Sequence, residues 1–307
     1  MEEFLQYLFD GLSIGSVYSL LALGLVIIYR GTGHLNFAQG EMALLSTYVV
    51  YQCGEWGIPI GFALIIGIAV GFVLGSVTEV ALVRPVSKKS PFAVFIVTLG
   101  LFQGLNWLSG AIWGDQLLPN SAVSEQKSFP TLFPSKDTDF VTILGASWRL
   151  KYLGVLILVL VLTGMLFVVF NKTKLGLAMR AVASNPESAK LVGIPTNRIL
   201  MVSWGMAAAI GALGGVVFAG INGNVNLSLM FTVFIYASAA ATLGGFDSPG
   251  GAVIAGLSIG VIESMAAGYA KEWVGQEMKL GVAFLIIVGV LWVKPSGLFG
   301  TAKVERV

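Results

Sequence analysis

Nine long apolar segments, separated by short polar stretches, dominate this sequence. They cover residues 12–29, 35–51, 58–83, 92–112, 152–170, 199–221, 229–243, 252–267 and 280–293. A helix needs roughly 20 mostly apolar residues to cross the hydrocarbon core of a bilayer. We therefore expect an all-α polytopic membrane protein with about nine (eight to ten) transmembrane segments. The last three are short and joined by glycine-rich turns, so some could be half-helices or re-entrant pieces.

The composition supports this class and excludes several others. Only 11% of the residues are charged and 56% are hydrophobic, whereas soluble domains carry about 25% charged residues. Cys53 and His34 are the single cysteine and histidine, which argues against metal sites and against most cysteine or histidine catalysis. The sequence has no Gly-Lys dipeptide and thus no phosphate-binding loop. We expect residues 1–307 to form one transmembrane domain with no catalytic or metal site and no bound cofactor.

Lysine and arginine residues predict how the chain sits in the membrane. With Arg30, residues 84–89, residues 171–198 and the tail after Val293 on one side, that side holds 12 of the 18 basic residues. Short cytoplasmic loops carry such an excess. We therefore predict a cytoplasmic C-terminus and an N-terminus outside. The basic residues are spread over several short loops, which argues against a nucleic-acid partner.

Residues 171–198 form the most distinctive polar stretch. It contains five basic residues, among them Arg180 and Lys190. The pattern predicts a short helix over residues 186–192, because Asn185 can cap it and Pro186 suits its first position. An acid, Glu187, lies near the positive end of the helix dipole. The helix has Leu191 near its end, Gly193 suits the C′ position, and Pro195 stops continuation. We interpret the stretch as a folded cytoplasmic element.

Residues 113–151 form a second long polar segment. It has mixed charge and three prolines, and the run from Phe140 to Ile143 followed by Gly145 is typical of a strand and a turn. We expect an outer loop or small cap, with a hairpin. Asn222, Asn224 and Asn226 predict a polar connection at the same side.

Several polar side chains interrupt the apolar segments. Asn36, Gln39 and Glu41 open the second segment, and Gln103 and Asn106 share one face of the fourth. Polar groups in hydrocarbon are costly unless they face protein or water. These residues either make interhelical hydrogen bonds, with Asn36 also a candidate cap, or line a transport pathway.

Two acids and one turn complete the set of candidates. Glu79 lies five residues before Arg84, with which it can pair, and Glu263 lies inside the eighth segment and needs a partner. Gly244 and Gly245 belong to a glycine-rich turn between short apolar segments, a pattern that marks some transporter sites and is equally typical of a plain helix hairpin. Glycines four apart also recur, as at Gly11 and Gly15 or at Gly256 and Gly260, which predicts tight helix packing.

Four motifs together resemble one family. They are Asn36–Glu41 (NFAQGE), Arg84-Pro85, residues 176–193 (GLAMRAVASNPESAKLVG) and residues 243–251 (LGGFDSPGG). In this order and spacing they resemble the branched-chain amino acid ABC transporter permeases, and most closely the smaller of their two permease subunits. The resemblance extends over almost the whole chain. At Gln39 many relatives have histidine.

The resemblance implies a function and partners. The chain would be a permease subunit in the bacterial inner membrane, paired with a homologous second permease. Two cytoplasmic ATPase subunits would bind ATP and magnesium, and an outer binding protein would deliver the amino acid. Coupling to the ATPase would lie in residues 171–198, whereas the outer loop would dock the binding protein. The coupling residues would be Arg180, Asn185, Pro186, Glu187, Lys190, Leu191 and Gly193, and the pathway candidates Asn36, Gln39, Glu41, Gln103, Asn106, Gly244 and Gly245.

Two alternatives remain open at the level of sequence. Urea and short-amide permeases look similar. An ion-coupled secondary transporter could use Glu41 or Glu263 as a carboxylate relay. An ATP-driven permease stops when ATP is removed, whereas an ion-coupled carrier works alone and collapses with an uncoupler.

Overall fold

Helices make up most of the part of the chain that the structure describes. The computed structural model describes residues 2–87, 90–114, 127–133, 136, 139–143, 145–269 and 279–300. The helices are α1 (Glu2–Thr32), α2 (Gln39–Glu55), α3 (Ile60–Thr78), the π-helix η1 (Glu79–Val83), α4 (Arg84–Ser87), α5 (Pro91–Trp113), α6 (Leu150–Lys172), α7 (Lys174–Ser184), α8 (Pro186–Leu191), α9 (Thr196–Asn222), α10 (Leu229–Gly244), α11 (Pro249–Tyr269) and α12 (Lys279–Val293). The short strands are β1 (Lys127–Ser128), β2 (Phe140–Ile143), β3 (Ala146–Arg149) and β4 (Asn224–Val225).

The expected class of all-α polytopic membrane protein is confirmed. Each of the nine apolar segments coincides with a helix. In the described part of the chain, six helical stretches are long and apolar enough to cross a membrane. The helices α2, α10 and α12 have 17, 16 and 15 residues and are shorter than a full span. The count of nine spans therefore remains a prediction.

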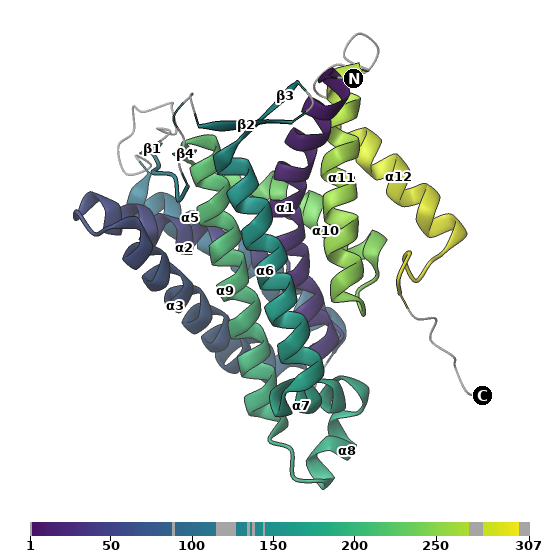
Figure 1. The fold of residues 1–307 in the computed structure, drawn as a ribbon. Helices are drawn as coiled ribbons and strands as arrows, with labels where there is room; N and C mark the ends of the chain where they lie inside the picture. Colours follow the sequence, from purple (N-terminus) through teal and green to yellow (C-terminus); the bar gives the residue numbers. More distant parts are fainter. Residues whose placement is uncertain are drawn as a thin grey trace.

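Two helices form the centre of the bundle. In their most apolar 18-residue windows, α1 is 89% buried and α9 is 72% buried, whereas α3, α5 and α6 are each 22% buried. These three helices lie outside and expose apolar side chains, which suits contact with lipid. Both helices run through the length of the bundle in Figure 1, and they contact each other.

Glycine faces bring the helix backbones into contact. Gly11 and Gly15 of α1 meet Gly256 and Gly260 of α11, and a methyl group added at Gly15 would come within 2.8 Å of the Gly256 carbonyl oxygen. The predicted packing role of these glycines is thus confirmed. Helices in lipid associate through such small-residue faces because backbones can approach closely.

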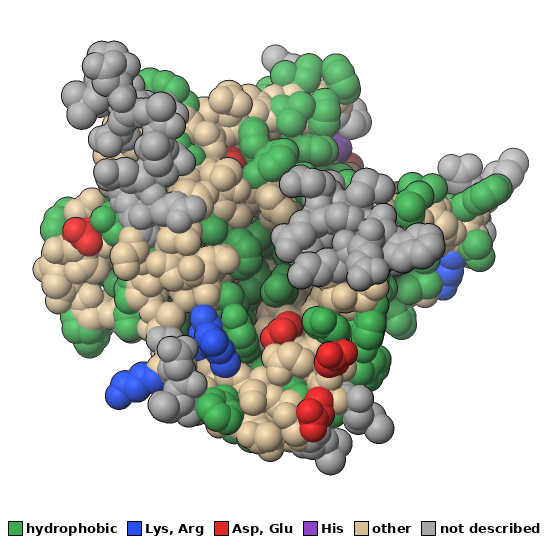
Figure 2. Space-filling model, turned by 90° about the horizontal axis from the view of Figure 1, so that it is seen from above, with side chains coloured by type: hydrophobic (Ala, Val, Ile, Leu, Met, Phe, Trp, Pro, Cys, Tyr) green, Lys and Arg blue, Asp and Glu red, His purple; other side chains and the backbone are tan. Residues whose placement is uncertain are grey.

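Both strand pairs lie at the end of the bundle that holds the N-terminus (Figure 1). Strands β2 and β3 form the expected antiparallel hairpin, with Phe140 opposite Arg149, and Gly145 in its turn has φ +91°. Strands β1 and β4 also pair, with Ser128 opposite Asn224. The strand β1, which follows α5, therefore lies beside β4 in the connection between α9 and α10, and the two form one surface. Figure 2 looks onto this end, where acidic (red) and basic (blue) side chains form small separate groups.

The opposite end carries the elements α7 and α8, which project below the bundle in Figure 1. The sequence predicted α8 but not α7. Thr173 caps α7 by accepting a 3.2 Å hydrogen bond from the Gly176 amide. Met179 and Val182 are buried on its inner face. Residues 174–184 are thus a packed amphipathic helix rather than a loop.

Candidate functional site

The short helix α8 forms as its sequence predicts. The side-chain oxygen of Asn185 accepts hydrogen bonds of 3.0 Å from the amides of both Glu187 and Ser188. At the other end, Gly193 has φ +82°, and the Ile194 amide donates to the Ala189 carbonyl at 3.0 Å. A glycine in this left-handed conformation commonly ends a helix. Six helical residues are therefore held in one shape from both ends.

The outer tip of α8 is apolar and faces away from the bundle. Leu191 is 89% exposed and Val192 is 76% exposed, whereas Ala189 is buried against the neighbouring elements. Lys190 pairs with Glu187 at 3.2 Å on the exposed side. Two large apolar side chains on a rigid projecting helix suit docking into a partner protein.

The helix α7 anchors α8 to the bundle. Arg180 of α7 donates a hydrogen bond to the backbone carbonyl of Phe170 near the end of α6. Arg30 at the end of α1 lies with its guanidinium 5.9 Å from the centre of the Phe170 ring. Arg30 and Arg180 line a small recess between α1, α6 and α7. Arg180 therefore holds α7 against α6 and does not belong to the exposed tip of α8.

The helix α2 begins inside the bundle, four residues later than expected. The Gln39 side chain lies between Gly24 of α1 and Gly211 of α9, and its amide donates to the Ala207 carbonyl at 2.8 Å. Asn36 donates to the Gln39 side-chain oxygen at 3.2 Å. Because Gly24 and Ala207 belong to the interior of their helices, the chain turns back into the bundle before α2 starts.

Glu41 and Asn106 form the next polar contact. The Asn106 amide donates at 3.1 Å both to Glu41 and to the Leu227 carbonyl. This bond joins α2, α5 and the segment before α10. The second carboxylate oxygen of Glu41 is buried and has no hydrogen-bond partner among the described residues. Gln103, one turn before Asn106, is exposed on the outer side of α5.

The glycine pair at the end of α10 contacts the chain itself. Gly244 lies against the backbone of Gly251, and Gly245, with φ +96°, lies against Gly300. The Leu298 amide donates to the Leu243 carbonyl at 2.7 Å. These glycines allow backbone to approach backbone, and they do not join the cluster of Asn36, Gln39, Glu41 and Asn106.

Glu263, which is half-buried, and Glu79, which is buried, both have partners. The Tyr18 hydroxyl donates to Glu263 at 2.7 Å, and the Tyr18 ring stacks on Tyr236 with centroids 4.7 Å apart. The predicted pairing of Glu79 with Arg84 is also confirmed. Burial lowers the pKa of His34, in the loop before α2. The described residues contain no group of three or more metal-ligating side chains.

Sequence reasoning missed the contacts that come from distant parts of the chain. The role of Gly24 and Gly211 as walls around Gln39 depends on three helices meeting at one depth. Asn197, which accepts from Arg84 at 3.1 Å, was also not singled out. Two local signals would have predicted α7: the spacing of the buried residues Met179 and Val182, and Thr173 as a cap at its start.

The arrangement defines a polytopic membrane protein with a short, capped helix that projects from one end. Comparison with known proteins agrees: the chain belongs to the family described as branched-chain amino acid transport system / permease component, whose model matches residues 7–291. It is 28% identical to the high-affinity branched-chain amino acid transport permease LivH of Escherichia coli, over 99% of this chain and 98% of the relative.

Two further relatives help to define the range of substrates. BraD, a high-affinity branched-chain amino acid transport permease of Pseudomonas aeruginosa, is 30% identical over 99% of this chain and 98% of its own length. MglC, a galactose/methyl galactoside import permease of Escherichia coli, is 26% identical over 86% of this chain and 78% of its own length. The relatives of this chain are thus permeases named for chemically different substrates.

Proposed function

We propose that this chain is the transmembrane permease subunit of an ATP-driven importer for branched-chain amino acids. The observation that carries the proposal is α8: a short helix, capped at both ends, with Leu191 and Val192 exposed at its tip. A rigid element transmits force better than a loop, and an apolar tip needs a protein partner. The full-length similarity to LivH and BraD supports the substrate class.

Energy enters from other subunits in this proposal. The chain has no phosphate-binding loop in its sequence, so ATP and magnesium bind to two cytoplasmic ATPase subunits. The tip of α8 sits in a cleft of an ATPase, and closure of the ATPases pushes α8 and α7 against the bundle. The bundle then alternates between inward-open and outward-open states.

The two ends of the bundle have different partners. The end with α7 and α8 faces the cytoplasm of a bacterial cell, in accord with the excess of basic residues there, and the N-terminus faces outward. The surface of the β1–β4 pair and the β2–β3 hairpin receives the substrate-binding protein. A homologous second permease subunit completes the heterodimer in the inner membrane.

The substrate pathway runs along α2, α5 and the start of α10. Asn36, Gln39, Glu41 and Asn106 form its polar part in the bundle interior, and Gln103 faces outward toward the second permease. Gly244 and Gly245 shape the turn that holds the end of α10. An apolar path with few polar groups suits leucine, isoleucine and valine.

Uptake by reconstituted vesicles tests the proposal. The permease, its second permease, the ATPases and the binding protein are reconstituted together, and uptake of leucine, isoleucine, valine and urea is compared. We expect ATP-dependent uptake of the three amino acids and no response to an uncoupler. Urea uptake alone would contradict the substrate class, and uncoupler-sensitive uptake by the isolated chain would contradict ATP coupling.

A further inference from the structure

The junction between α3 and α4 contains a wide helical turn. Residues 79–83 form a π-helix, and the Arg84 amide donates to the Glu79 carbonyl, five residues back. In a regular α-helix, side chains five apart point about 140° away from each other. The wider π turn, whose hydrogen bonds span five residues, brings them to one side. The turn therefore lets Glu79 and Arg84 meet as a pair.

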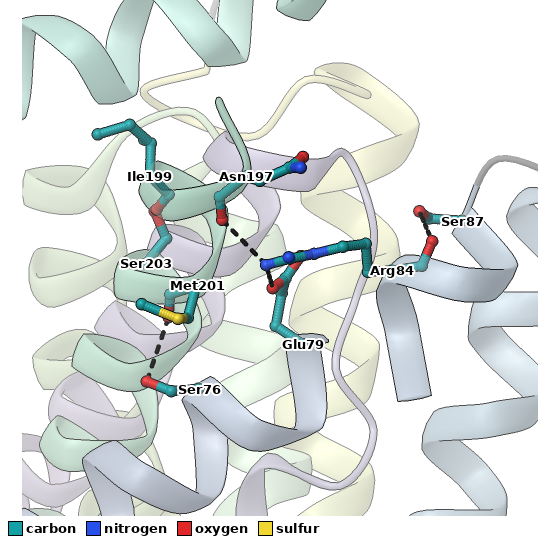
Figure 3. A network of polar contacts seen from close by, with 8 residues as sticks. All are labelled: Ser76, Glu79, Arg84, Ser87, Asn197, Ile199, Met201 and Ser203. Atoms are coloured by element: carbon teal, nitrogen blue, oxygen red, sulfur yellow. Dashed lines mark hydrogen bonds and ion pairs between the residues drawn. The ribbon is translucent and has the colours of Figure 1, made fainter. Parts of the chain in front are cut away.

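Arg84 holds two partners at once, as Figure 3 shows. Its Nε donates to Glu79 at 3.1 Å, and a terminal nitrogen donates both to the second oxygen of Glu79 and, at 3.1 Å, to the Asn197 carbonyl. Glu79 is 2% exposed. A buried carboxylate is strongly destabilising without its partner charge. We call Glu79, Arg84 and Asn197 the inner latch.

The inner latch lies directly beside the joint between α8 and α9. Ile194 donates to Ala189, Thr196 donates to Ile194, and Ile199 donates to Pro195, with distances of 3.0, 2.8 and 3.1 Å. These backbone hydrogen bonds brace the short connection between α8 and the first turn of α9, where Asn197 lies.

Beyond the inner latch, α3 and α9 are packed backbone to backbone. A methyl group at Gly71 would lie 2.9 Å from both the Ala208 carbonyl oxygen and the Ala212 side chain. Ser76 donates to the Met201 carbonyl at 3.4 Å. These contacts hold α3 to α9 along their length, whereas α5 has no comparable packing against α9 among the described residues.

We propose that the inner latch transmits movement of α8 to the π turn and α4, which follow α3. Arg84 is a positioning residue in this role: it fixes the first turn of α9 to the π turn, so that both move together during the transport cycle. The inference rests on the proposed function, since it assigns the inner latch to the coupling of ATP hydrolysis to transport.

Four variants separate the effects of charge, geometry and folding. Arg84→Gln removes the hydrogen bonds of Arg84 to both Glu79 and Asn197. Arg84→Lys keeps the positive charge but loses the planar guanidinium that binds two acceptors at once. Glu79→Gln removes the buried negative charge. The double variant Glu79→Gln/Arg84→Gln leaves no unpaired buried charge, so it keeps the test valid if Arg84→Gln folds poorly. Glu55→Gln, an exposed acid at the far end of α2, is the matched control.

The first measurement is hydrogen exchange of the full chain in detergent. In Arg84→Gln and the double variant we expect faster exchange of the amides of residues 198–201, by about tenfold, the factor equivalent to 1.4 kcal/mol, with the exchange of α1 unchanged. Unchanged exchange at residues 198–201 overturns the inner latch itself, whether or not the wild-type complex transports amino acids.

The second measurement is leucine taken up per ATP hydrolysed in the reconstituted complex. We expect this ratio to fall about tenfold in Arg84→Gln and the double variant, to fall less in Arg84→Lys, and to stay at the wild-type value in Glu55→Gln. ATP hydrolysis itself should continue. Faster exchange with an unchanged ratio overturns the transmission role, and a wild-type complex without uptake overturns the proposed function instead.

Discussion

The Gln39 side chain donates a 2.8 Å hydrogen bond to the backbone carbonyl of Ala207, 168 residues further along the chain. This bond fixes the start of α2 to the interior of α9. It forms because glycines at positions 24 and 211 leave room for a long side chain between three helices. A polar residue thus specifies where a short helix begins inside an apolar bundle.

Replacing Gln39 with alanine should destabilise the bundle. The change removes a buried hydrogen bond and leaves a cavity, so we expect a loss of about 2 kcal/mol in the free energy of unfolding. Thermal unfolding of the purified protein measures the effect. Gln103→Ala, at an exposed position, is the matched control and should change stability by less than about 0.5 kcal/mol. Equal losses in both variants would contradict the packing role of Gln39.

Removing the cap of α8 should loosen that helix alone. Asn185→Ala deletes the acceptor for the Glu187 and Ser188 amides, and N-cap losses cost about 1 kcal/mol. We expect faster hydrogen exchange of these two amides and less uptake per ATP, with membrane insertion unchanged. Asn222→Ala, at the opposite end of the bundle, should leave exchange in α8 unaltered. Normal uptake by a well-expressed Asn185→Ala protein would count against α8 as the coupling element.

The exposed tip of α8 should decide binding to the ATPase subunits. Leu191→Asp places a charge where an apolar contact is proposed, and we expect co-purification with the ATPases to be lost. The thermal stability of the permease alone should not change, because the side chain is 89% exposed and substitutions at such positions are usually neutral. Retained co-purification would show that the partner binds elsewhere.

Contact between α3 and α9 should tolerate no added side chain. Gly71→Leu would push into Ala208 and Ala212, and overpacking of this kind costs about 1–3 kcal/mol. We expect a lower yield of folded protein and a lower unfolding temperature. Gly100→Leu, at an α5 glycine with open space around it, provides the comparison and should fold normally. The prediction is wrong if the two leucine variants fold equally well.

The sequence predicted those features that depend on neighbouring residues, such as the ends of α8. Asn185, Pro186 and Gly193 lie within nine residues and encode both ends of α8 through capping and backbone conformation, so this helix could be predicted to within one residue. The role of the helix-packing glycines could also be predicted. The four-residue spacing of Gly11 and Gly15 indicates a close helix contact, which they make with Gly256 and Gly260.

Other features depend on residues that are far apart in the chain. The late start of α2 is set by Gly24 and Gly211, and the pairing of β1 with β4 joins segments about 100 residues apart. The pairing of Glu79 with Arg84 is local, but the second partner of Arg84, the Asn197 carbonyl, lies more than 100 residues away in the chain. Such contacts follow from the packed bundle, which hydropathy alone does not describe.

The helix α9 joins the two ends of the molecule without interruption. It runs for 27 residues from the first turn beside Arg84 to Asn222, just before β4, a length of about 40 Å. A straight rod of this length acts as a lever: a rotation of about 10° around its middle displaces each end by roughly 3.5 Å. In the proposed importer, docking of the binding protein outside and ATP binding inside would therefore influence each other equally, as linkage between two sites requires.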